Sequence, residues 1–299
     1  MTSVLAAIGP VFVVTAAGYL LRRYVVLDVK TLSALNIYLF IPALVFASLS
    51  QQTIAWALFG KYAAGVILML LATGVVLELL ARFRGMGQAR HSAFLMTMFP
   101  NLGNFGLPVC KFAFGETGLT LAVVVMVCGS FLQNSVGIYF AQRSRHGIRQ
   151  ALLKVLGFPM IYAFAAALLS QQMSWRLPEF LFRGVEITSE AAIPVQLMIL
   201  GIQLAETRLQ KDVDIFLACF VRLVLGPIFA AVIATLAGME GLSAGVFILQ
   251  MSGPVAVGMA VYGIHFEVSP GFLANVVAWT FLLSLLSVSL VLYFLLRPV

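Results

Sequence analysis

The most constraining feature of this sequence is a nearly unbroken series of apolar stretches, each about 20 residues long, joined by short connectors. A stretch of this length crosses the hydrocarbon core of a bilayer as an α-helix. Hydrophobic residues make up 62% of the 299 residues and charged residues only 10%, against about 25% in soluble domains. Because a soluble globule cannot cover so much apolar surface, the sequence predicts an all-α membrane protein without a separate soluble domain.

The positions of the connectors predict ten membrane-spanning helices. They are expected at residues 2–21, 31–50, 54–80, 89–114, 117–140, 149–170, 178–205, 213–237, 242–265 and 270–296. Alternate connectors are rich in Lys and Arg, with twelve such residues on one side of the membrane and five on the other. Since cytoplasmic connectors carry the basic excess, both termini are expected on the non-cytoplasmic side of the cell's inner (plasma) membrane. The net charge of +7 is thus assigned to orientation, and nucleic acid is not an expected partner.

Five spans in each half, with both termini on one side, predict two inverted repeats, residues 1–147 and 148–299. The spacing of the prolines supports this division. Three pairs of prolines in corresponding spans are separated by 149, 152 and 154 residues: Pro10 and Pro159, Pro42 and Pro194, and Pro100 and Pro254. In transporters built from inverted repeats, the substrate binds near the midplane where helices of the two repeats are broken.

Two of the predicted spans carry such breaks. In the fourth span, the nine residues PNLGNFGLP at 100–108 hold two prolines, two glycines and two asparagines. In the ninth span, the sequence SGP at 252–254 lies at the matching place. Unwound backbone at this depth is tolerated where it lines a cavity or is buried in protein, and the N-termini of half-helices suit an anion. The expected substrate-binding residues are therefore Asn101, Gly103, Asn104, Gly106, Pro108, Ser252, Gly253 and Pro254.

Ionisable residues within the spans are functional candidates because they are costly to bury in a bilayer. Arg222, in the eighth span, is interpreted either as a counter-ion for a substrate carboxylate or as the partner of a buried glutamate. Glu190, in the seventh span, is the expected partner and an alternative carrier of a coupled proton. Arg183 is expected to neutralise Glu186 near the outer surface. Lys111 either extends to that surface or faces the cavity.

Amide side chains in the spans must find internal partners. Gln133 and Gln250 lie in the fifth and ninth spans and are expected at the cavity, whereas Gln196 and Gln203 are expected to bond between helices. The cysteines lack the spacing of a metal site, and the three histidines form no catalytic pair. The chain is therefore not expected to be an enzyme, and no cofactor is expected beyond a coupled H⁺ or Na⁺.

The motif Asn-x-Gly-x-x-Gly-Leu-Pro at 101–108 resembles the fourth-helix crossover of the auxin efflux carrier family, which includes plant auxin exporters and bacterial malonate and malate carriers. Other segments resemble further helices of this family in the correct order. They are Phe40–Phe46, Lys154 with Pro159, Ile193–Pro194, Leu200–Ala205, Pro254 and Val268–Pro270. The resemblance therefore extends along the whole chain.

This resemblance implies a fold shared with bile-acid symporters and proton–sodium antiporters. In that fold, helices 1, 2, 6 and 7 form a scaffold, and helices 3–5 and 8–10 form a mobile transport domain. It also implies a homodimer held by the scaffold and an elevator-type mechanism. By the same resemblance, Asn101 matches the crossover asparagine that contacts carboxylate substrates, and Glu190 falls where plant carriers have an aspartate.

The chain departs from the plant pattern at two places. Val255 and Ala256 follow Pro254 where the plant pattern has polar and small residues, and a short connector joins the fifth and sixth spans. These departures argue against auxin and favour a small organic anion, a mono- or dicarboxylate, as the substrate. The alternatives are a sodium-coupled symporter of the bile-acid type, and a membrane-embedded sensor or channel.

Overall fold

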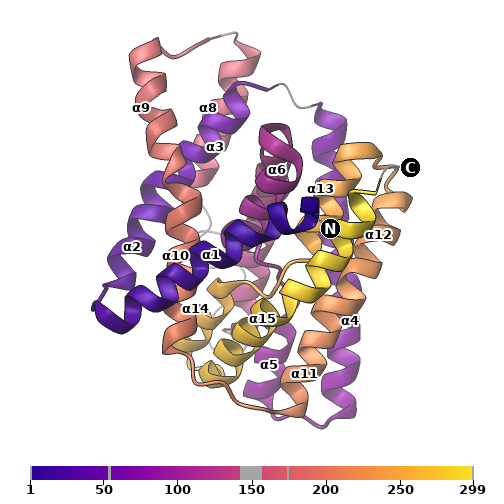
Figure 1. Ribbon diagram of the computed structural model, residues 1–299. Coiled ribbons are helices and arrows are strands. Elements are labelled where there is room, and N and C mark those ends of the chain that lie inside the picture. The colour runs from indigo at the N-terminus through magenta and orange to yellow at the C-terminus, as the bar shows by residue number, and fades with distance from the viewer. Residues whose placement is uncertain (1, 53–54, 142–156, 174, 298–299) are drawn as a thin grey trace.

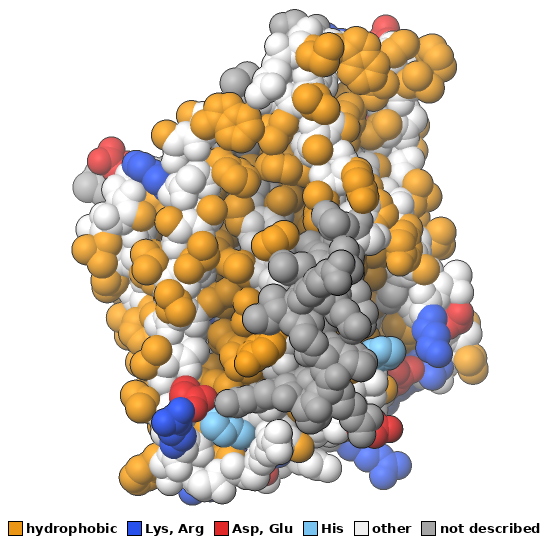
Figure 2. Space-filling model, turned by 180° about the vertical axis from the view of Figure 1, so that it is seen from behind, with side chains coloured by type: hydrophobic (Ala, Val, Ile, Leu, Met, Phe, Trp, Pro, Cys, Tyr) orange, Lys and Arg blue, Asp and Glu red, His pale blue; other side chains and the backbone are white. Residues whose placement is uncertain are grey.

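The computed structural model describes residues 2–52, 55–141, 157–173 and 175–297, and every regular element in these ranges is a helix. Seven helical segments in them are long and apolar enough to cross a membrane. On the face shown in Figure 2, apolar side chains cover the middle of the molecule and charged side chains lie mostly toward its ends. The chain is therefore a multi-pass membrane protein, as the sequence predicts.

The described chain forms helices within the predicted spans, and several of those spans are divided into shorter helical segments. In the first half they are α1 (Thr2–Tyr24), α2 (Val29–Leu35), η1 (Asn36–Phe40), α3 (Ile41–Ser50), α4 (Trp56–Phe83), α5 (Gln88–Met96), η2 (Leu102–Gly106) and α6 (Leu107–Ala141). In the second half they are α8 (Pro159–Gln172), α9 (Glu179–Glu190), α10 (Ala192–Glu206), α11 (Val213–Phe220), η3 (Val221–Leu225), α12 (Gly226–Leu236), α13 (Gly241–Met251), α14 (Val257–His265) and α15 (Pro270–Leu295).

Two details bear on the predicted spans. Helix α6 is interrupted at Gly115, whose φ of 68° requires a residue without a side chain, and the predicted boundary between the fourth and fifth spans falls there. The start of the predicted sixth span, from residue 149, lies partly outside the described residues. The total of ten spans and their inverted symmetry stay predictions.

Three short π-helical turns each precede a proline near the start of the next helix. They are η1 before Pro42, η2 before Pro108 and η3 before Pro227. A proline has no N–H to donate, and its ring clashes with the carbonyl four residues earlier. Widening the preceding turn to π geometry is one way in which a helix accommodates that clash.

The helices contact one another in two groups (Figure 1). The α10 group consists of α1, α2, η1, α3, α8, α9 and α10, with α1 packed along α10 and α3 along α8 and α9. The α6 group consists of α4, α5, η2, α6 and all helices from α11 to α15. The groups meet where α1, α3, α8 and α10 touch α6, α15 and η2.

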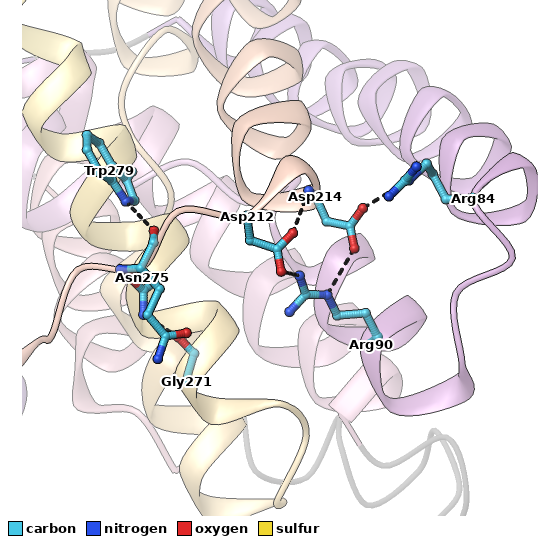
Figure 3. A network of polar contacts seen from close by, with 8 residues as sticks. Arg84, Arg90, Asp212, Asp214, Gly271, Asn275 and Trp279 are labelled. Atoms are coloured by element: carbon cyan, nitrogen blue, oxygen red, sulfur yellow. Dashed lines mark hydrogen bonds and ion pairs between the residues drawn. The ribbon is translucent and has the colours of Figure 1, made fainter.

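Polar contacts between helices stay almost entirely inside each group. Arg90 binds both Asp212 and Asp214, at 2.6 and 3.3 Å, and Arg84 also binds Asp214, which joins α4 and α5 to α11 (Figure 3). In the α10 group, Arg22 of α1 binds Glu206 of α10 at 2.7 Å. In the described part of the chain, the one side-chain hydrogen bond joining helices of different groups runs from Thr120 Oγ1 to the Ser48 carbonyl.

The α1–α10 contact depends on two glycines. A Cβ on Gly18 would lie 2.8 Å from Cα of Met198, and a Cβ on Gly201 would lie 2.7 Å from the Tyr19 nitrogen. Small residues allow membrane helices to approach this closely.

We expect Gly201→Ala to force the two backbones apart and to destabilise the protein by about 1–3 kcal/mol. Thermal unfolding of the purified protein in detergent measures this cost. Gly9→Ala, in α1, is the matched control because nothing lies within 4 Å of its would-be Cβ. Equal unfolding temperatures for the two variants would contradict the close contact.

Candidate functional site

The two broken segments predicted from the sequence meet in space. Pro100 and Val255 form an isolated antiparallel bridge, which is held by two backbone hydrogen bonds. The Asn101 amide donates to the Pro254 carbonyl at 2.8 Å, and the Ala256 amide donates to the Phe99 carbonyl at 2.9 Å. We call residues 99–106 and 252–256 together the crossing. The proline and glycine patterns in two distant parts of the sequence thus form one structural unit.

Two helix N-termini begin at the crossing. Helical structure resumes at Leu102 and runs through η2 into α6, and it resumes again at Val257 in α14. Neither start has a side-chain cap among the described residues, since neither the side chain of Asn101 nor that of Ala256 accepts a hydrogen bond from the turn that follows it. The first amides of a helix have no partner within the helix, so both starts offer free donors and partial positive charge.

Asn101 itself is 5% exposed, and its side-chain nitrogen Nδ2 has no hydrogen-bond partner in the described structure. A buried amide without a partner is unfavourable and calls for an explanation. The unpaired Nδ2 is one more donor at the start of η2. The predicted residues Gly103, Asn104 and Gly106 follow within η2, and Pro108 lies in the first turn of α6.

Arg222 lies on the opposite side of the crossing, where the preceding half-helices end. Its Nη1 donates to the Met98 carbonyl at 2.9 Å, and its Nη2 donates to the Met251 carbonyl. These carbonyls follow the C-terminal end of α5 and close that of α13. Helix C-termini carry partial negative charge, so a buried guanidinium there is electrostatically favourable. The side chain is 1% exposed and joins the two broken segments.

This position corrects one prediction. A pair between Arg222 and Glu190 is one of the alternatives that the sequence leaves open, but the guanidinium bonds to backbone carbonyls and Glu190 lines a separate pocket. The pattern of charged residues indicated a carboxylate partner because backbone carbonyls leave no trace in the sequence. The expected neutralisation of Glu186 by Arg183 is also wrong, since Arg183 binds Glu179 at 2.5 Å.

The predicted residue Gln250 lies at the end of α13 and is fully buried. Its Nε2 donates to the Ala122 carbonyl of α6 at 3.0 Å, while its Oε1 has no partner and lies against Gly106. A Cβ on Gly106 would overlap that oxygen, so this glycine is needed for close approach. Gln250 therefore connects α13 to α6 and to η2.

The remaining predicted residues differ in their surroundings. Gln133 of α6 lies against the start of α14, with Nε2 3.1 Å from where a Cβ on Gly258 would be. Ser252 is buried, but its hydroxyl donates back to the Ile248 carbonyl in its own helix at 2.6 Å. A Cβ on Gly253 would lie 3.4 Å from the Phe105 ring, so this glycine packs against the other segment of the crossing.

The carbonyls exposed by the two breaks are largely occupied. Hydrogen bonds from protein donors reach the main-chain oxygens of Met98, Phe99, Pro100, Asn101, Gln250, Met251 and Pro254. The backbone groups left over near the crossing are thus mainly donors, at the starts of η2 and α14. An excess of free donors favours a negatively charged ligand.

An open pocket of about 520 Å³ lies at the seam between the two groups, lined by residues of α3, of α6 and of α9 and α10. Its ionisable residues are Lys111, Glu116, Glu186 and Glu190. Lys111 therefore faces this pocket, where it binds Glu116 at 3.0 Å. Glu186 and Glu190 form no ion pair in the described structure, which leaves the pocket with unbalanced acidic charge.

Two polar contributors were not assigned to the site from the sequence. The Thr280 hydroxyl of α15 accepts a hydrogen bond from the Val255 amide at 3.1 Å and thereby holds the 252–256 segment of the crossing in place. Gln196 of α10 is fully buried near Gly103, and neither polar atom of its amide has a partner in the described structure. A polar residue one turn after Ile193–Pro194 was the available signal, but it does not reveal which helix the side chain faces.

Comparison with known proteins agrees with these observations. Residues 3–292 match the family described as membrane transport protein. An uncharacterized transporter of Methanocaldococcus jannaschii is 26% identical, over 94% of this chain and 95% of that protein. An uncharacterized transporter of Methanothermobacter thermautotrophicus is 27% identical, over 94% of each chain. The chain therefore belongs to the membrane transport protein family, which is the auxin efflux carrier family that its motifs indicate.

Proposed function

We propose that this protein carries small organic anions, mono- or dicarboxylates, across the membrane and binds them at the crossing. The observation that carries the proposal is the excess of unpaired donors there. Two helix starts without side-chain caps and the buried Nδ2 of Asn101 provide donors without partners, whereas most of the nearby carbonyls already accept hydrogen bonds. A carboxylate satisfies several such donors at once.

The same excess of unpaired donors over free carbonyls favours this proposal over a sodium-coupled symporter. A sodium site at a broken helix uses free backbone carbonyls and side-chain oxygens. Here Arg222 binds two of those carbonyls and also contributes a positive charge that repels a cation. An organic-anion carrier is therefore better supported than a sodium-coupled symporter.

We also propose an elevator-type movement of the α6 group against the α10 group. In this proposal the α10 group is the scaffold and the α6 group is the transport domain. The confinement of polar contacts to each group supports it, since sliding would break one described hydrogen bond between helices of the two groups, that of Thr120. Homodimerisation through the scaffold and the side of the membrane that holds the termini stay predictions.

Ligand binding to the purified protein tests the proposed substrate class. We expect malonate, succinate or butyrate to raise the unfolding temperature in detergent in a saturable way. The uncharged amides malonamide and butyramide are matched controls of similar shape, and we expect no effect from them. Stabilisation by the amides and acids alike, or by none of the acids, would contradict the anion site.

Glu190 is the proposed coupling residue because it lines the pocket without an ion-pair partner in the described structure. We expect Glu190→Gln to abolish stimulation of acid uptake by an inward proton gradient, because glutamine cannot take up a proton. Uptake without a gradient should persist. Proteoliposome uptake with and without the gradient measures this effect.

Glu179→Gln is the control, since Glu179 lies on the same helix but pairs with Arg183 at the surface. This variant should retain the stimulation seen in the unmodified protein. Stimulation that persists in Glu190→Gln would exclude Glu190 as the coupling group. Stimulation by sodium instead of protons would show that a different site couples transport.

A further inference from the structure

The amide of Gln196 is the least satisfied side chain in the described structure. It is fully buried in α10, and both Nε2 and Oε1 lack a hydrogen-bond partner. Buried amides nearly always have partners, so two unpaired atoms on one side chain are unusual. A contact with a neighbouring helix, which is the ordinary role of such an amide in a membrane, does not account for either atom.

Gln196 faces the crossing from the other group of helices. Its Oε1 is 4.0 Å from the position that a Cβ would take on Gly103, and α10 contacts η2. Gly103 is in the first turn of η2, two residues after Asn101, whose Nδ2 is also unpaired. Unpaired polar groups thus lie on both sides of the seam, one on α10 and the others at the uncapped helix start.

The pocket at the seam approaches this point. Its lining on α10 includes Ile193 and Pro194, and Gln196 follows two to three residues later on the same helix. At 1.5 Å per residue, that distance is roughly 3–5 Å along the helix axis. An acid that entered the pocket and reached the crossing would therefore meet Gln196 on one side and Asn101 on the other.

We propose that Gln196 is a substrate-binding residue contributed by the α10 group, and that its Nε2 donates a hydrogen bond to a carboxylate held at the start of η2. This inference rests on the proposed function and adds a ligand from the opposite side of the seam. It also explains why an unpaired amide is retained in the core: the acid supplies the missing partner. Because α10 and η2 belong to different groups, the bond is made only when the groups stand as described here.

The test separates binding from folding. Removing an unsatisfied amide should not weaken the ligand-free protein, so we expect Gln196→Leu to unfold at the same or a higher temperature. Its affinity for malonate, succinate and butyrate should fall about tenfold, since a hydrogen bond to a charged group is lost. Gln196→Glu should bind still more weakly, because it places a negative charge beside the carboxylate. Titration calorimetry measures the affinities.

Gln203→Leu is the matched control. Gln203 lies two turns further along α10, and its buried Oε1 is likewise unpaired. This variant should keep the affinity of the unmodified protein. Equal affinity in Gln196→Leu, or a lower unfolding temperature without ligand, would overturn the assignment of Gln196 alone. If the unmodified protein binds none of the three acids, the proposed function fails and this inference fails with it.

Discussion

Replacing Arg222 with methionine is expected to remove most of the correctly folded protein, with a loss of about 3 kcal/mol or more in stability. The guanidinium donates to the Met98 and Met251 carbonyls, which are drawn together by the crossing. Methionine fills a similar volume but leaves both carbonyls buried without these donors, and each unpaired group costs about 1–3 kcal/mol. The variant also removes the positive charge that interacts favourably with the partial negative charge of two helix C-termini. The yield of monodisperse protein and its unfolding temperature measure the effect.

Arg222→Lys is the conservative variant for this test, and Arg183→Met is the surface control. Lysine keeps the charge but lacks the planar fork that reaches two carbonyls, so Arg222→Lys should recover part of the stability. Arg183 is exposed and pairs with Glu179 on the surface, so its replacement should change stability little. If Arg222→Met folds normally and only raises the apparent KM for acids, then Arg222 is a substrate counter-ion and its structural role is wrong.

Replacing Asn101 with alanine is expected to lower transport by one to two orders of magnitude while leaving the fold intact. The side-chain Nδ2 has no partner in the described structure, and the backbone bonds of Asn101 across the crossing do not need its side chain. Loss of one hydrogen bond to a charged substrate removes about 1.5–3 kcal/mol, which lowers kcat/KM roughly 10- to 100-fold. Uptake at a subsaturating acid concentration, together with the unfolding temperature, measures both effects.

Asn275→Ala is the control variant, from which we expect lower stability and an unchanged affinity for acids. The Asn275 side chain accepts the Gln210 amide at 2.6 Å and donates to the Gly271 carbonyl at 2.8 Å. Its removal should therefore lower the unfolding temperature, because the Gln210 amide and the Gly271 carbonyl both lose a partner. The acid affinity of the protein that remains folded should be unchanged. A large stability loss in Asn101→Ala would show that Asn101 has a structural role like that of Asn275.

The sequence contains strong information about where the helices break. Pro100, Pro108 and Pro254 each remove a backbone donor, and the neighbouring glycines permit non-helical geometry. These effects are local, so both breaks and most helix bounds could be predicted from residues alone. That the two segments would meet followed only from the inverted-repeat interpretation and from the family resemblance.

Contacts that depend on the relative rotation of packed helices could not be predicted in the same way. Arg222 binds carbonyls, and a carbonyl occurs in every residue, so no residue pattern favours Met98 or Met251 over the carboxylate of Glu190. Gln196 resembles Gln203 in the sequence, yet only Gln196 is placed beside Gly103. The facing direction of each amide is set by the packing of α10 on α1 and η2.

The most direct test of a carboxylate site at the crossing is uptake of labelled malonate, succinate and butyrate into proteoliposomes that contain either the unmodified protein or Asn101→Ala. A carboxylate site at the crossing predicts saturable uptake of at least one acid by the unmodified protein and competition by the unlabelled acid but not by its uncharged amide. It also predicts loss of that uptake in Asn101→Ala at equal levels of inserted protein. Absence of uptake for every acid, or equal uptake by the two proteins, would contradict it.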